Sequence, residues 1–113
     1  MKWLPQNTIN SMFVLLLYAY HETEQAHSNL RHYLSHGPIP PAHGRQVFVV
    51  NGPHSLTPAH FAKDDTIIER ANEGFDFGAW AIGLQRAPQH DYTHVVLMNA
   101  SVRGPYLPSY ETR

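Results

Sequence analysis

A continuous run of nine apolar residues, 12–20, is the feature that most constrains the fold of this chain. Such a run is typical of a strand that is covered on both faces, as in a parallel sheet. It is shorter than a membrane span, which needs about 20 residues. It also lacks the basic segment and the small-residue cleavage site of a signal peptide. The run therefore predicts a buried strand of an α/β domain.

Three further apolar segments alternate with segments of helical spacing. The expected strands are 46–50, 66–69 and 93–98, and the expected helices are 22–35, a short one from Thr57 to about Lys63, and one marked by Phe77, Trp80, Ala81 and Leu84. Residues 1–10 are a loose lead-in and residues 106–113 an irregular tail. This order predicts one α/β domain over 1–113, with a Rossmann-like parallel sheet of about four strands and flanking helices.

Capping signals set the ends of the two longer helices. Thr23 is placed to cap the first helix at its N-terminus, and Gly37-Pro38 is a stop signal. Asp76 occupies the N-cap position of the second helix, and Pro88 closes it. These signals agree with the apolar spacing.

Composition narrows the class of partner and the chemistry. A chain of 113 residues fits one domain with a modest core. The formal net charge of −1 creates no global field for nucleic acid or an anionic membrane, so nucleic acid is not expected as a partner. The absence of cysteine excludes disulfides and thiol chemistry and leaves the compartment open. We expect the cytoplasm or the periphery of a membrane, and no transmembrane segment.

Two polar turns each follow an expected strand, at the edge where α/β sheets bind ligands. The first is Asn72-Glu73-Gly74-Phe75-Asp76, in which Gly74 permits a positive φ. Gly78 and Gly83 each cost roughly 1 kcal/mol relative to alanine in a helix, which indicates close approach of a backbone or a ligand. The alternative is that Asp76 only caps the helix and the glycines only pack on the sheet. Because Asp76 would compete with a phosphate for helix N–H groups, it fits a sugar hydroxyl, a base or a metal better.

The second turn is Asn99-Ala100-Ser101, followed by Arg103. Two-residue alternation places the Asn99 and Ser101 side chains on one side, as two ligands to a metal or a phosphate require. Arg103 is suited to pair with a phosphate. The alternative is a polar strand end with an ordinary Asx-type turn.

Nine histidines are scattered over the chain. His32 and His36 lie four residues apart on the expected first helix, which allows a shared metal, although solvated side chains are the simpler interpretation. His21 differs because it follows the first strand at the ligand edge. No nucleophile elbow, P-loop or dinucleotide-binding glycine motif is present, so those enzyme classes lack their signatures.

Several of these stretches together resemble glycosyltransferase-like proteins related to polysaccharide transferases of the rhamnan-synthesis type, within the GT-A type nucleotide-sugar transferases. The matching stretches are Tyr18-Ala19-Tyr20-His21-Glu22-Thr23, Asn29-Leu30 with Tyr33-Leu34 and His36-Gly37, Phe48-Val49-Val50-Asn51-Gly52, residues 72–80 and residues 96–105. The resemblance spans about residues 18–108. It implies a nucleotide-diphospho-sugar donor bound across the carboxyl edge of the sheet, a glycan acceptor and, in a complete enzyme, hexosyl transfer.

The resemblance also assigns the donor-binding residues. They would be His21, Thr23, Asn51, Asn72, Gly74, Asp76, Asn99, Ser101 and Arg103. The Asn99-Ala100-Ser101 turn lies where many GT-A enzymes carry an Asp-x-Asp metal motif, but it holds no acidic residue. Mg²⁺ or Mn²⁺ would then have only Asp76 and Asn99 as weak candidate ligands, since these cations prefer carboxylates.

A full GT-A domain is much longer than this chain, so the resemblance implies the donor-binding half of one, truncated after the fourth strand. No residue stands out as the catalytic base. A non-catalytic Rossmann-like ligand-binding or interaction module with a degenerate site is the first alternative, and a histidine-dependent metal protein is the second. A fourth strand without later neighbours would expose apolar surface and favour self-association.

Overall fold

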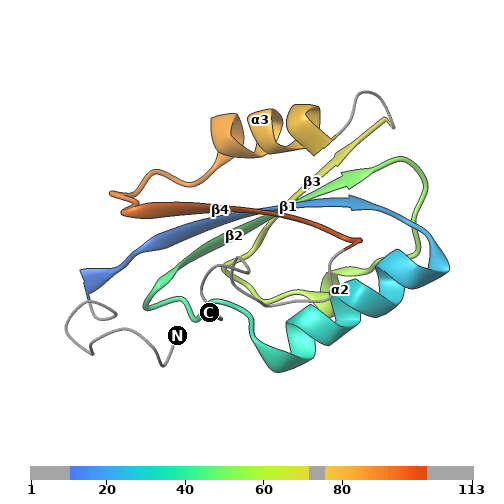
Figure 1. Cartoon of the computed structure of the whole chain (residues 1–113), viewed down its shortest axis with the longest axis horizontal. Coiled ribbons are helices and arrows are strands. Elements are labelled where there is room, and N and C mark those ends of the chain that lie inside the picture. The colour runs from blue at the N-terminus through green and yellow to red at the C-terminus, as the bar shows by residue number, and fades with distance from the viewer. Residues whose placement is uncertain (1–10, 72–75, 102–113) are drawn as a thin grey trace, which may run out of the picture.

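A computed structural model of the chain describes residues 11–71 and 76–101 (Figure 1). The elements are β1 (Val14–His21), α2 (Glu24–His36), β2 (Gly44–Asn51), the 3-10 helix η1 (Pro58–His60), β3 (Thr66–Arg70), α3 (Asp76–Arg86) and β4 (His94–Asn99). The lead-in 1–10 and the tail 106–113 lie outside the described residues. The predicted alternation of strands and helices is confirmed.

The four strands form one parallel sheet in the order β3-β2-β1-β4. The chain therefore moves from β1 through β2 to β3 in one direction, then returns to the other side of β1 to form β4. Figure 1 shows α2 on one face of the sheet and α3 on the other. This is the predicted Rossmann-like α/β arrangement.

Strand β1 is covered on both faces, as the apolar run predicts. Every residue from Val14 to Tyr20 is at most 3% exposed. Leu16, Tyr18 and Tyr20 pack towards α2, while Leu15, Leu17 and Ala19 pack towards α3. Each of the three leucines contributes about 1.5–3 kcal/mol on full burial, so both faces of β1 are strongly specified.

The predicted capping residues of α2 are confirmed, and the helix runs over Glu24–His36 rather than 22–35. The Thr23 hydroxyl accepts a hydrogen bond from the Ala26 amide at 3.0 Å. At the other end, the Gly37 amide donates to the Tyr33 carbonyl. Ala26, Leu30 and Tyr33 are buried on the sheet side of the helix. The apolar spacing of this segment therefore gave the correct face.

The short helix after β2 differs from its prediction. It ends at His60 rather than near Lys63, and Phe61 has an extended backbone. The Phe61 ring lies 4.9 Å from the Phe48 ring, against the core on the α2 side of the sheet. Packing of this aromatic ring competes with continued helix, and the packing prevails.

Asp76 is the first residue of α3 rather than its N-cap. Gly83 of this helix lies directly on the sheet: a Cβ there would meet Val49 at 3.2 Å and Leu17 at 3.3 Å. Gly83 therefore packs against side chains of the sheet. This agrees with the alternative interpretation, in which the helix glycines only pack on the sheet.

Candidate functional site

The strand order reverses at β1, so β1 and β4 lie side by side at the turning point of the sheet. In open parallel sheets, the crevice beyond the carboxyl ends of two such strands is the usual position of a ligand. The residues singled out from the sequence that the structure places at this carboxyl edge are His21, Thr23, Asn51, Asp76, Asn99 and Ser101. Asn72, Gly74 and Arg103 lie outside the described residues.

Two of the predicted site residues meet directly. The Asn99 Nδ2 group donates a hydrogen bond to Asp76 Oδ2 at 3.0 Å. The pair joins the last residue of β4 to the first residue of α3, 23 positions apart in the sequence. The structure thus brings a carboxylate to the strand end where the sequence itself has only Asn-Ala-Ser.

Asn99 also organises the turn that follows it. Its Oδ1 accepts hydrogen bonds from the Ser101 amide at 3.0 Å and from the Ser101 hydroxyl at 2.5 Å. This is the Asx-type turn that was the alternative interpretation of the motif. Asn99 and Ser101 bond to each other here, with the Asn99 amide nitrogen directed at Asp76.

A second cluster links the ends of β1, β2 and β3. Asn51 is 7% exposed, donates to the Tyr20 carbonyl at 3.0 Å, and accepts from Arg70 Nε at 2.5 Å. A Cβ on Gly78 would lie 3.2 Å from a terminal guanidinium nitrogen of Arg70. Gly78 therefore leaves room for this guanidinium against the first turn of α3.

Arg70 was not among the predicted site residues. The signal that identifies it is its position as the last residue of a strand, immediately before the polar turn. The structure places its guanidinium against Gly78, two residues from Asp76. The carboxyl edge thus holds both a guanidinium group, on Arg70, and a carboxylate, on Asp76.

Glu22 is a second residue that sequence analysis missed, although it directly follows β1. Its Oε1 accepts hydrogen bonds from the Ser55 amide at 2.9 Å, the Ser55 hydroxyl at 3.0 Å and the Tyr20 hydroxyl at 3.0 Å. The Ser55 amide bond, the largest cause, lowers the pKa of the Glu22 carboxyl below its ordinary value. The carboxylate ties the end of β1 to the β2–β3 connection.

Helix α2 also holds the turn that follows β4. Asn29 is 2% exposed and donates through Nδ2 to the Ala100 carbonyl at 2.8 Å. Gln25 donates to the Asn29 side-chain oxygen at 2.9 Å. This buried amide fixes the Ala100 carbonyl against the middle of α2.

The charges at this edge favour some ligand groups over others. Glu24 lies in the first turn of α2, and Asp76 begins α3. Carboxylates at helix N-termini compete with an anion for the positive end of the helix dipole. These two positions therefore suit hydroxyl or amino groups of a ligand, and Arg70 is the position that suits negative charge.

Metal ligands do not gather in the described residues, which contain no group of three or more His, Asp or Glu side chains arranged around a common point. The rings of His32 and His36 stack with centroids 4.1 Å apart. His36 Nδ1 also lies 2.9 Å from the His32 carbonyl oxygen, a hydrogen bond within the helix.

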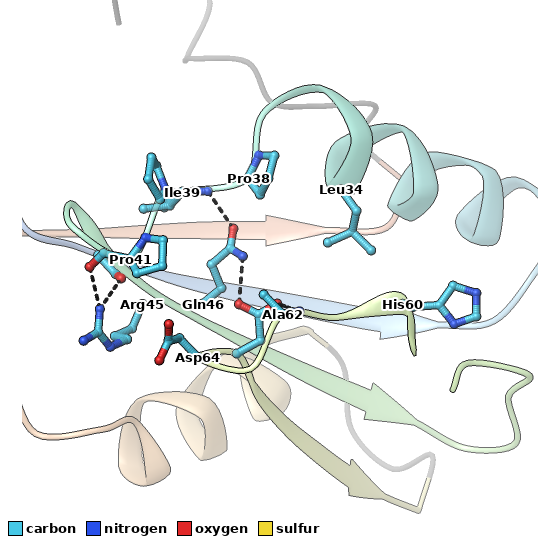
Figure 2. A pocket seen from close by; sticks show the side chains of 12 residues that line it. Leu34, Pro38, Ile39, Pro41, Arg45, Gln46, His60, Ala62 and Asp64 are labelled. Carbon is cyan, nitrogen blue, oxygen red and sulfur yellow. Dashed lines mark hydrogen bonds between the residues drawn. The ribbon is translucent and has the colours of Figure 1, made fainter. Parts of the chain in front are cut away.

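A pocket of about 380 Å³ lies at the opposite, amino end of the sheet (Figure 2). Its central residue is Gln46, which is 3% exposed. The Gln46 amide accepts from the Tyr33 hydroxyl and from the Ile39 amide, and it donates to Asp65 Oδ1 at 3.0 Å. These bonds tie β2 to α2, to the loop before β2 and to the residue before β3. We therefore assign the polar groups around Gln46 to the scaffold.

Within residues 11–71 and 76–101, no helix has both the length and the hydrophobicity to cross a membrane. No protein-family model, curated protein or solved structure matches this chain.

Proposed function

We propose that the carboxyl edge of the sheet binds the nucleotide-diphospho-sugar donor of a glycosyltransferase-type reaction, with a glycan as acceptor. The contact between Asp76 and Asn99 at the point where the strand order reverses is the observation that supports this most. A carboxylate held by an amide is a strong hydrogen-bond acceptor for a sugar or ribose hydroxyl. Asp76 would take that role.

The donor diphosphate is the leaving group in such a reaction and needs positive charge nearby. Arg70 lies at the same edge against Gly78, and Arg103 follows the Ser101 turn in the sequence. We assign charge stabilisation of the diphosphate to these guanidinium groups. Mg²⁺ or Mn²⁺ would add to it, with Asp76 as the candidate carboxylate ligand at the end of β4.

Calorimetric titration of the folded chain with UDP-, GDP- and dTDP-sugars, with and without Mn²⁺, tests the proposal. Saturable binding of at least one nucleotide-sugar, stronger than binding of the free sugar, is expected. The absence of binding to any of them by a well-folded sample would refute it.

The same titration, followed by an assay of sugar transfer, separates the proposal from a non-catalytic binding module. Asn51 and Thr23 favour that alternative, because both side chains are engaged in hydrogen bonds that hold the scaffold together. A binding module takes up the nucleotide-sugar without transferring the sugar to any glycan, whereas the enzyme transfers it.

A further inference from the structure

Strand β4 is an edge strand of the described sheet, and it is unusually apolar for that position. Val95 is 50% exposed, Val96 39% and Leu97 50%. Edge strands are normally protected against pairing by charges, proline or bulges. The opposite edge strand, β3, follows this rule because it ends in Glu69 and Arg70, whereas β4 contains no Asp, Glu, Lys, Arg or Pro.

The exposed apolar surface lies on both faces of this edge. Leu97 shares its face with Asn99, which bonds to α3, so Val95 and Leu97 lie on the α3 side. Val96 shares its face with Met98, which belongs to the core on the α2 side. A further strand paired with β4 would cover both faces at once through cross-strand side-chain pairs.

Helix α3 carries two further exposed apolar side chains. Phe77 is 80% exposed, and Leu84 is 56% exposed. The Phe77 ring packs edge-on against Trp80, with ring centroids 5.6 Å apart, and Trp80 Nε1 donates to the Met98 carbonyl of β4 at 2.9 Å. Trp80 therefore links Phe77 to β4.

We propose that a second copy of this chain occupies the edge, by antiparallel pairing of β4 with β4 about a two-fold axis at Val96. Such an axis, perpendicular to the sheet, joins like faces and reverses the strand direction. It places Val96 opposite Val96 and Val95 opposite Leu97, so apolar side chains meet on both faces. The edge is uncharged when histidine is neutral, so no like charges meet across the axis.

The backbone is compatible with this register. The Ala100 amide donates to the Ala19 carbonyl of β1, so by alternation the amides and carbonyls of Val95 and Leu97 face the free edge. In the proposed pairing, these residues form the hydrogen-bonded pairs and Val96 forms a non-hydrogen-bonded pair. Because the strands are antiparallel, the two carboxyl edges point in opposite directions, and the pairing does not depend on the proposed donor site.

Light scattering after size-exclusion chromatography tests the pairing. The chain is expected to reach twice its 12.9 kDa mass as concentration rises. Val96→Lys places two charges on the axis and weakens dimerisation at least about tenfold. Ile67→Lys is the matched control, because Ile67 lies on the other edge strand with the same 39% exposure and should leave the dimer unchanged. A monomer at all concentrations, or equal loss in both variants, would overturn the proposal.

Oxidation of single-cysteine variants tests the register, since the chain has no cysteine of its own. Cα atoms of a non-hydrogen-bonded pair lie about 4.5 Å apart, within reach of a disulfide. Val96→Cys should therefore form a covalent dimer rapidly. In Val95→Cys, the two cysteines would be about 8 Å apart and should cross-link much more slowly. Equal rates for Val96→Cys, Val95→Cys and Ile67→Cys would contradict the two-fold pairing and indicate either a different partner for β4 or non-specific association.

Discussion

Asp76 Oδ2 lies 3.0 Å from Asn99 Nδ2, and this hydrogen bond joins the start of α3 to the end of β4. The bond closes the β3–α3–β4 unit at the edge where ligands bind in parallel sheets. It also turns the Asn99 side-chain oxygen towards Ser101 and leaves the Asp76 carboxylate as the acidic group at the strand end. Structure and proposed function therefore depend on the same pair.

The Asp76–Asn99 bond should be measurable as a coupling free energy. Asn99→Ala is expected to lower the free energy of unfolding by about 1.5 kcal/mol, the low end for a hydrogen bond to a charged group, because the pair is half-buried. Asp76→Ala should cost a similar amount, since it also removes a negative charge at the helix N-terminus. Urea denaturation of both single variants and the double variant measures the coupling; strictly additive losses would show that the bond contributes nothing.

Gly83 should tolerate no large side chain. Its Cβ position meets Val49 and Leu17, which are at most 1% exposed, so a larger side chain would have to displace packed core residues. Gly83→Leu is expected to destabilise the fold by about 1–3 kcal/mol despite the better helix propensity of leucine.

Ala81→Leu is the control for Gly83→Leu, because Ala81 lies on the exposed side of the same helix. It should change stability by less than about 0.5 kcal/mol. Thermal melts compare the two variants, and similar melting temperatures would mean that α3 does not rest on the sheet at Gly83.

Glu22 should make stability depend on acid pH. Its pKa is lower in the folded chain than its ordinary value of 4.5, chiefly because the Ser55 amide donates to it. A depressed pKa contributes stability above pH 4.5 that is lost as the pH falls through the folded pKa. Glu22→Gln should therefore flatten the decline in melting temperature below pH 4.5. Glu24→Gln, in the first turn of α2, is the control variant with which it is compared. An unchanged decline in Glu22→Gln would rule out this role.

The apolar patterns predicted the fold well because burial determines them. The run 12–20 predicted a two-faced strand, which the structure has at Val14–His21, and Thr23 and Gly37 marked the ends of α2 correctly. The error at η1 arose where a local helix signal met a long-range contact, since Phe61 packs against Phe48. Sequence spacing does not report such a contact.

The site was only partly visible in the sequence. Position after a strand identified Asp76 and Asn99, but their contact depends on how α3 crosses the sheet. Arg70 and Glu22 were missed because a charged residue at a strand end looks the same whether it faces solvent or a neighbouring loop. Arg70 bonds to Asn51 and Glu22 bonds to Ser55, and in each pair the two residues lie on separate segments of the chain. No local sequence pattern shows that such segments meet.

The most direct measurement is the affinity of Asp76→Asn for whichever nucleotide-sugar the unmodified chain binds, beside that of Asp91→Asn. Asn preserves the shape of the side chain and removes its charge, and Asp91 is an exposed carboxylate before β4, at the other end of that strand. We expect at least about tenfold weaker binding for Asp76→Asn and unchanged binding for Asp91→Asn. Equal affinities of Asp76→Asn and the unmodified chain would contradict it.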